Sequence, residues 1–282
     1  MIGTVTDEVL RKSYPKRHQW DRKGDHGKVL VIGGSRRYKG APAMCGLSAL
    51  RAGADLVTVA APETSADIIA SFSPNLITEP LMGDYISVDN VHTLEHLASK
   101  FDAVVIGNGL GRMVETKDAV HELLSYIRQP CVIDADALHL ISEDKKLLRK
   151  GWVITPHASE FYNLSGHRVQ KNVESRVKEV IRFSKEFKCT VLLKGYKDVI
   201  AEGQNVLVNS TGNPYMTVGG TGDVLSGICG AFLAMGMKSL SAAACAAYVC
   251  GEAGDMAAED MGPGMLATDV LGRIPAVLKK KL

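Results

Sequence analysis

The residues best suited to chemistry lie in TVGGTGDVLSGICGAF (residues 217–232), where Gly219, Gly220 and Gly222 precede Asp223 and an apolar run. Glycines before a helix leave its first N–H groups open, and the helix dipole favours a bound anion such as phosphate. A carboxylate there would repel the anion unless it accepts a proton from a hydroxyl that attacks the phosphoryl group. The alternative, an acid that stabilises the helix start by less than ~1 kcal/mol, explains Asp223 but not the glycines. We therefore interpret Asp223 as a catalytic base.

Two aspartates follow another apolar run in QPCVIDADAL (129–138). Asp134 and Asp136 are two residues apart, which places them on the same side of an extended chain. Such a pair can hold Mg²⁺, with waters and phosphate oxygens as the remaining ligands. Alternatively, Asp136 caps the helix that begins with ALHLI.

TPHASE and LLKG place further polar side chains after apolar runs. His157 can orient a polar ligand or exchange a proton, and Glu160 can be a first-turn acid of a helix. Lys194 is placed to reach anions over a sheet edge. Two alternatives stay open: a hydrogen-bonded structural histidine, and a lysine whose head extends into solvent.

Three further segments are rich in glycine or small residues: residues 33–35 (GGS), 40–43 (GAPA) and 107–111 (GNGLG). The first can wrap a phosphate or form a tight turn, and it matches neither a dinucleotide fingerprint nor a GK[ST] phosphate loop. GAPA suits close approach of a flat ligand or close helix packing. Three glycines in GNGLG exceed what a turn needs, which favours contact with a ligand.

These motifs end short β-branched runs that alternate with helical patterns. The expected strands lie within residues 28–35, 55–63, 101–111, 129–138, 151–157 and 189–195, with a hairpin over 198–209. Helices are expected over 41–54, 170–187, 224–236, 240–259 and 267–279. The alternation predicts an α/β fold: a mostly parallel central sheet with helices on both faces, and ligands at the carboxyl ends of its strands. No linker or repeat divides the chain, so residues 1–282 are interpreted as one domain.

Bulk composition excludes several classes of function. The 282 residues carry a formal charge of +2 with both signs interspersed, so no nucleic acid is expected as a partner. The apolar runs are too short or too glycine-broken to span a bilayer, and no membrane partner is expected. Six cysteines without a CxxC pair indicate buried thiols in a reducing compartment, hence the cytoplasm. The basic ends RKSYPKRH and KKKL are expected to be solvated tails.

Together the motifs resemble a known family. GGTGDVLSG resembles the GxGD signature of the ribokinase-like superfamily, whose fold is three-layered. The ordered set GKVLVIGGSRRYKGAPA, VVIGNGLG, VIDADAL, ITPHASEF, VLLKG and GEAGDMAAE resembles the ADP/ATP-dependent NAD(P)H-hydrate dehydratases, from about Lys23 to Pro275. The resemblance implies a lyase of metabolite repair, which phosphorylates the hydroxyl of hydrated NADH or NADPH (NADHX, NADPHX) with ATP or ADP. Phosphate then leaves and the ring double bond returns, and Mg²⁺ is the implied cofactor.

Carried over by position, the resemblance also implies site residues. The catalytic set is Asp223, Gly220 and Gly222; the substrate set is Ala41, Ala43, Gly109, His157 and Asp223. The nucleotide set is Lys194, Gly195, Tyr196, Lys197, Asp198, Gly219, Thr221 and Gly222, and the metal set is Glu160 and Asp134.

Departures from the family pattern are few. Asn108 stands where proline is common, and because the glycines remain we expect little change. Cys250 stands where a histidine is frequent and touches no implied catalytic group. Many members carry an N-terminal epimerase domain; residues 1–22 are too few for one, so the NAD(P)HX epimerase is expected on a separate chain. Relatives imply a homotetramer or larger assembly.

Two other functions compete with the dehydratase. A kinase for a hydroxymethyl pyrimidine or hydroxyethyl thiazole alcohol would share the GxGD signature, but its pattern does not include GGSRRYKGAP or TPHASE. A non-catalytic nucleotide sensor on the same fold would bind ATP without turnover, and the intact Asp223 argues against it.

Overall fold

The computed structural model describes residues 2–282. Its strands are β1 (Ile2–Thr4), β2 (Lys28–Ile32), β3 (Leu56–Pro62), β4 (Ile77–Leu81), β5 (Ala103–Ile106), β6 (Cys131–Ile133), β7 (Val153–Ile154), β8 (Thr190–Leu193), β9 (Asp198–Glu202) and β10 (Asn205–Asn209). Its α-helices are α1 (Asp7–Ser13), α2 (Gly40–Arg51), α3 (Glu63–Ser71), α4 (Val91–Ala98), α5 (Val114–Tyr126), α6 (Ala135–Leu140), α7 (Ala158–Ser165), α8 (Val173–Phe187), α9 (Thr221–Ala234), α10 (Ser239–Met261) and α11 (Ala267–Lys281).

All these strands form one sheet, in the order β1-β10-β9-β8-β7-β6-β5-β2-β3-β4. Strand β9 is antiparallel to both β8 and β10. The other neighbouring pairs are parallel. The predictions of a mostly parallel sheet and of a hairpin over 198–209 are confirmed.

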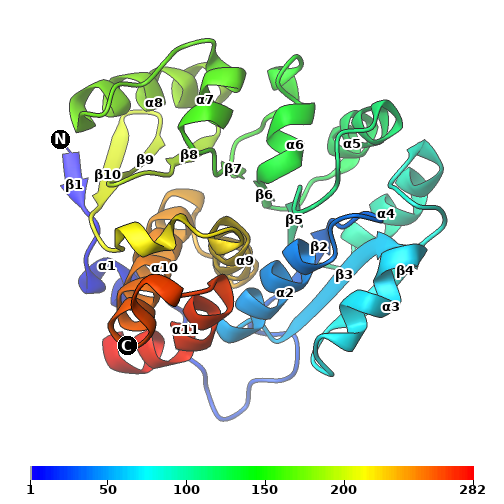
Figure 1. The fold of residues 1–282 in the computed structure, drawn as a ribbon, viewed down its shortest axis with the longest axis horizontal. Coiled ribbons are helices and arrows are strands. Elements are labelled where there is room, and N and C mark those ends of the chain that lie inside the picture. Colours follow the sequence, from blue (N-terminus) through cyan, green and yellow to red (C-terminus); the bar gives the residue numbers. More distant parts are fainter. Residues whose placement is uncertain (1) are drawn as a thin grey trace.

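Strand β2 shows why helices cover both faces of the sheet. Val29 and Val31 join the apolar cluster formed with α1, α2, α9, α10 and α11, whereas Leu30 and Ile32 join the cluster formed with α4–α8. All four side chains are fully buried, because successive residues of a strand point to opposite faces. The two helical layers lie on opposite sides of the sheet in Figure 1, which confirms three layers.

The predicted helix over 170–187 and the three C-terminal helices are present as α8 and α9–α11. Strands β1 and β4 were not predicted. β4 is an edge strand that contains Glu79 and Pro80, and its exposed positions give it no apolar run. β1 has three residues and gains its place only by pairing with β10.

Most residues of the basic ends, 11–18 and 279–282, are exposed as expected, but the helices that carry these ends pack against the fold. Leu10 of α1 is fully buried, and Tyr14 packs edge-on against Phe232 of α9 with ring centroids 5.8 Å apart. At the other end α11 extends through Lys281, whose ammonium nitrogen lies 3.0 Å from Glu252. Long basic side chains here cover the apolar contacts beneath them.

The remaining expectations from composition concern thiols and bilayers. All six cysteines are free and buried, as predicted. Among residues 2–282, none of the helices combines the length and apolar character that crossing a bilayer requires.

Candidate active site

The carboxyl ends of β2, β5, β6, β7 and β8 share one edge of the sheet, because these strands run parallel. The loops that follow them carry GGS, GNGLG, DAD, TPH and KG. Asp223, in the first turn of α9, reaches the same edge, where Asn108 after β5 donates to its Oδ1 at 2.6 Å. The topology therefore brings together motifs that are far apart in the sequence.

Helix α9 begins at a glycine because no other residue fits there. Gly220 is the N-cap residue with φ of 102°, and a Cβ on it would lie 2.7 Å from Met44 and 2.9 Å from Ala267. No side chain caps the helix start, so its first N–H groups remain available to an anion. A Cβ on Gly222 would lie 3.3 Å from Lys194 Nζ, which places the lysine beside this helix end.

The environment of Asp223 tunes its carboxyl group. Burial raises its pKa to about 6, the hydrogen bond from Asn108 opposes this shift, and the negative charge of Asp134 adds to it. Lys194 lowers the pKa and Asp136 raises it, both more weakly. A carboxyl group with this pKa is ionised at neutral pH yet basic enough to accept a proton.

Lys194, after β8, forms a cluster with two carboxylates. Its Nζ lies 3.1 Å from Asp134 Oδ1 and 3.9 Å from Glu160 Oε2. Burial lowers the pKa of Lys194, but the charges of Asp134 and Glu160 outweigh burial and hold that pKa above its usual value. The lysine is thus a fixed positive charge at the strand ends.

His157 and Glu160 form a reciprocal cap at the start of α7. The Nδ1 atom of His157 accepts from the N–H groups of Ser159 (3.1 Å) and Glu160 (3.2 Å), while Glu160 Oε2 accepts from His157 N (2.8 Å). The alternative of a hydrogen-bonded structural histidine is thus realised. His157 also lines the main cavity, so the cap aims its ring at a ligand site.

Asp134 and Asp136 do not form the carboxylate pair that an extended chain predicts. Ala135 has φ of 49°, so the chain turns directly after Asp134 and α6 begins. Asp136 instead accepts from Gly111 N at 3.0 Å and from Arg112 Nε at 2.9 Å. It does not cap α6 either, because the N-cap position belongs to Asp134.

A cavity of about 680 Å³ opens between the loop after β8 and the start of α9. Predicted residues that line it are His157, Lys194, Gly195, Tyr196, Asp198, Gly220, Thr221 and Gly222. Its other walls are Thr211, Gly212, Asn213, Pro214, Met216, Thr217, Val218, Leu225, Ala247, Cys250 and Gly251. Lys197 and Gly219 were predicted but do not line the cavity. Cys250, which stands where a histidine is frequent in the family pattern, is part of the cavity wall.

Two of the predicted substrate residues, Ala41 and Gly109, form a second group beside Asn108. A Cβ on Gly109 would lie 3.4 Å from Ala41 Cβ, so the loop after β5 touches the start of α2. Ala43 is buried and joins the core. Asn108 connects this group to Asp223, which does not line the cavity itself but follows Gly222, which does.

Two contributors to the site were missed by sequence reasoning. Arg176 of α8 is buried and donates to the carbonyl oxygens of Leu193 (3.0 Å) and Lys194 (2.9 Å), so it supports the loop after β8 from below. Asn108 was expected to change little, yet it bonds the proposed base. An arginine in an amphipathic helix gives no sequence signal for such a role.

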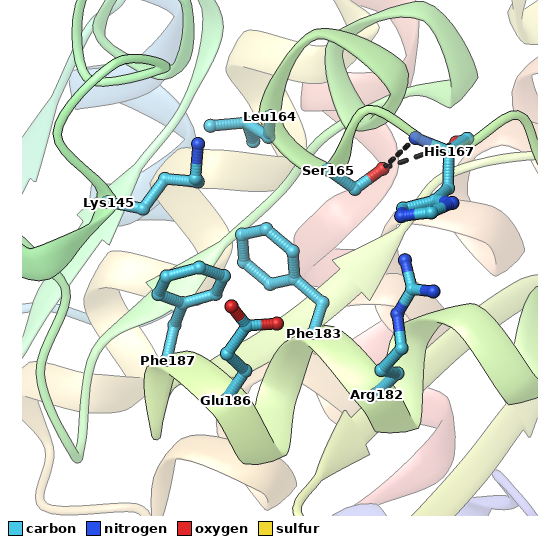
Figure 2. Close-up of a pocket in the computed structure, with 8 residues that line it drawn as sticks. All are labelled: Lys145, Leu164, Ser165, His167, Arg182, Phe183, Glu186 and Phe187. Atoms are coloured by element: carbon cyan, nitrogen blue, oxygen red, sulfur yellow. Dashed lines mark hydrogen bonds between the residues drawn. The ribbon is translucent and has the colours of Figure 1, made fainter.

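A second cavity, of about 320 Å³, lies away from this edge, beside α7 and α8 (Figure 2). Phe183 and Phe187 form its apolar wall, with Lys145, His167, Arg182 and Glu186 around them. None of the predicted site residues lines it.

Comparison with solved structures defines the class of fold. A ribokinase-like superfamily protein from Enterococcus faecalis matches with a TM-score of 0.87 at 25% identity, over 99% of this chain and 96% of that one. The ADP/ATP-dependent NAD(P)H-hydrate dehydratase from Bacillus subtilis, co-crystallised with ATP and Mg²⁺, gives 0.85 at 25% identity over 99% of both chains. The hydroxyethylthiazole kinase protein from Pyrococcus horikoshii gives 0.65 at 18% identity, which shows the fold alone. The fold is ribokinase-like.

Sequence relatives then define the family. The model of the NAD(P)H-hydrate dehydratase family matches residues 29–276. The ADP-dependent (S)-NAD(P)H-hydrate dehydratase of Nitrosopumilus maritimus is 39% identical over 279 residues, which are 98% of this chain and 96% of that relative. The bifunctional NAD(P)H-hydrate repair enzyme Nnr of Pyrobaculum aerophilum is 45% identical over 262 residues, 92% of this chain, and this chain spans 52% of its length. The chain belongs to the NAD(P)H-hydrate dehydratase family.

Proposed function

We propose that this protein is an ADP- or ATP-dependent dehydratase that returns (6S)-NADHX and NADPHX to NADH and NADPH. The observation that carries the proposal is the position of Asp223. This carboxyl group, with a pKa of about 6, lies in the first turn of α9, directly after Gly222 of the 680 Å³ cavity and hydrogen-bonded to Asn108, the neighbour of Gly109. A base at that point serves a hydroxyl on one side and a phosphoryl group on the other.

The chemistry follows from these positions. The added hydroxyl of NAD(P)HX attacks the terminal phosphorus of the nucleotide, and Asp223 accepts the hydroxyl proton. The bond from that phosphorus to its bridging oxygen breaks, so ATP leaves as ADP, or ADP as AMP. The open N–H groups at Gly220–Gly222 stabilise the charge on the phosphoryl oxygens. Because phosphate is a better leaving group than hydroxide, its bond to the ring carbon breaks. The neighbouring ring carbon loses a proton, and the double bond returns. The base then releases its proton to solvent.

The cavity is the proposed nucleotide site. Lys194 offers a buried positive charge for phosphate oxygens, and Gly195 lets the chain pass close above Arg176. Tyr196 is 91% exposed, so its ring is free to contact a base or ribose. Asp198 and Thr221 also line the cavity. Lys197 and Gly219, which lie next to lining residues in the sequence, complete the proposed nucleotide set.

Mg²⁺ fits the site as an ion held largely by phosphates. Among residues 2–282 no three His, Cys, Asp or Glu side chains are gathered to hold a metal ion by themselves. Asp134 and Glu160 face the same ammonium group, and such a sparse carboxylate set suits an ion that keeps waters and phosphate oxygens as ligands. When bound, Mg²⁺ would neutralise phosphate charge, with these two carboxylates as its protein contacts.

The substrate site is proposed on the opposite side of Asp223. Ala41 and Gly109 present little side chain there, which suits a flat dinucleotide ring. The other residues that the resemblance implies lie elsewhere: Ala43 is buried in the core, and His157 lines the cavity on the nucleotide side. The family match across residues 29–276 favours a dehydratase over an alcohol kinase.

We also propose the protein's wider setting. Residues 1–282 act as one domain in the cytoplasm, consistent with one continuous sheet and six buried free thiols. An NAD(P)HX epimerase is its functional partner, because it would supply the epimer that this site consumes. A homotetramer or larger assembly is the proposed state, to be measured by light scattering.

The test is an assay of purified protein with NADHX and, side by side, ATP or ADP. We expect NADH absorbance to return with release of phosphate. A product that stays phosphorylated would favour the kinase, and nucleotide binding without turnover would favour the sensor.

A further inference from the structure

The loop after β5 is built so that Asn108 reaches α9. Gly107 has φ of 131° and lies so close to Asp134 that a Cβ would be 1.8 Å from its carbonyl oxygen. Behind the loop, Gly34 N donates to Asn108 O at 2.9 Å. The Asn108 backbone is therefore held between β2 and β6, and its side chain is fully buried.

Both hydrogens of the Asn108 amide have acceptors on α9. Nδ2 donates to Asp223 Oδ1 at 2.6 Å and to Ser226 Oγ at 3.0 Å. An ionised carboxylate only accepts hydrogen bonds, so this pairing fixes which end of the amide faces Asp223. Asn108 Oδ1 is buried without a hydrogen-bond partner. Holding the amide in this orientation toward Asp223 therefore costs free energy.

The second carboxylate oxygen has no such restraint. Within residues 2–282, Asp223 Oδ2 takes part in no hydrogen bond or ion pair. We propose that Asn108 is the positioning residue of the base: its amide holds Oδ1 of Asp223 and thereby presents Oδ2 to the substrate hydroxyl. This inference deepens the proposed dehydratase function and rests on it for the identity of that hydroxyl.

The amide also controls when the base is charged. The groups that face Asp223 are Asp134 at the end of β6, Asp136 in α6, Lys194 after β8 and the Cys45 thiol of α2. Burial is the largest influence and raises the pKa of Asp223, whereas the Asn108 hydrogen bond is the next and lowers it. Without this donor the carboxylate would stay protonated to higher pH.

A proline at this position, common in the family pattern, has no side-chain donor. Control of the base by an amide therefore depends on Asn108 itself and not on the flanking glycines.

The test replaces the amide with an apolar group of similar shape, Asn108→Leu, and with the smaller Asn108→Ala in case leucine disturbs folding. The Asp223 carboxyl is titrated by ¹³C NMR in the nucleotide-free protein, and kcat is measured against pH. We expect the carboxyl midpoint and the acid limb of kcat to move up by about one pH unit. The KM of the nucleotide stays unchanged, since Asn108 does not line the cavity.

The control is Asn90→Ala, a buried asparagine that no hydrogen bond connects to Asp223. It should lower stability and leave the midpoint in place. An Asn108→Leu protein with the wild-type midpoint would overturn the inference while leaving the proposed function intact. The expected shift in Asn108→Leu, together with a wild-type protein that does not dehydrate NADHX, would overturn the function and keep the role of the amide.

Discussion

The ammonium nitrogen of Lys194 lies 3.1 Å from Asp134 Oδ1 and joins the ends of β8 and β6 across the intervening β7. Only 2% of the aspartate side chain is exposed, against 20% of the lysine side chain. The buried Asp134 carboxylate thus depends on Lys194 for a compensating charge, while the lysine also lines the cavity. One cation serves both the integrity of the strand ends and the proposed binding of phosphate.

Removing that cation should damage both properties. Lys194→Met leaves the Asp134 charge buried and unpaired, so we expect the free energy of unfolding to fall by about 3 kcal/mol. We also expect the affinity for ADP to fall by more than about tenfold, since one charge-assisted contact is lost. Urea unfolding and calorimetric titration measure the two effects.

The double variant Lys194→Met/Asp134→Asn separates them. It removes the unpaired charge and should regain most of the lost stability without regaining affinity. Recovered ADP binding in the double variant would show that Lys194 acts only as a structural partner of Asp134.

Asp223→Asn should abolish the chemical step while keeping the nucleotide. Loss of a positioned base lowers kcat by about 10²–10⁴-fold, and the amide keeps the shape of the side chain. The dissociation constant of ADP, measured by calorimetry, should change by less than about threefold, because nucleotide binding is assigned to the cavity and not to this carboxylate.

Asp136→Asn is the matched control, because that carboxylate bonds Gly111 and Arg112 and only weakly influences the pKa of Asp223. It should retain most of the turnover. An Asp223→Asn protein with a near-normal rate would remove Asp223 from the role of base.

Asp223→Asn should also stabilise the protein at neutral pH. Folding raises the pKa of Asp223 from 3.8 to about 6. Since the folded state binds the proton more tightly, stability is lost as pH rises from about 4 to about 6, and the ionised carboxylate opposes folding above that range. Asp223→Asn avoids this cost, so we expect a gain on the order of 1–2 kcal/mol at pH 7.5 that vanishes near pH 4. Urea unfolding at both pH values checks it, and equal differences at the two would refute it.

Arg176 should act through the loop that it supports. Arg176→Met leaves the carbonyl oxygens of Leu193 and Lys194 without their donor, at a cost of about 1–3 kcal/mol. The KM of the nucleotide should rise while kcat changes less, since the loop borders the cavity and not the base. Arg176→Lys should recover part of the affinity, and an unchanged KM in both variants would limit Arg176 to folding.

Sequence patterns predicted the layers of this fold because buried parallel strands carry continuous apolar runs. They missed β4, whose Glu79 and Pro80 break such a run at the sheet edge. They also missed β1, which has no pattern of its own and depends on β10.

The site was predictable where glycines and charged residues end the strands. Asp223, Lys194 and Gly222 lie at one edge, as the strand order requires. What the sequence could not show is side-chain direction: the φ of Ala135 turns Asp136 away from Asp134, and Asn108 reaches Asp223 from 115 residues away. Such pairings depend on tertiary contacts that no local pattern encodes.

The pairing of β1 with β10 also sets an order of folding. Ile2 lies opposite Val206, so the first strand has no partner until more than two hundred residues have been synthesised. Contacts of such long sequence separation form late, because closing the intervening loop is entropically costly. During synthesis β1 therefore stays unpaired until β10 has been made, and the pairing of β1 with β10 is one of the last steps of folding.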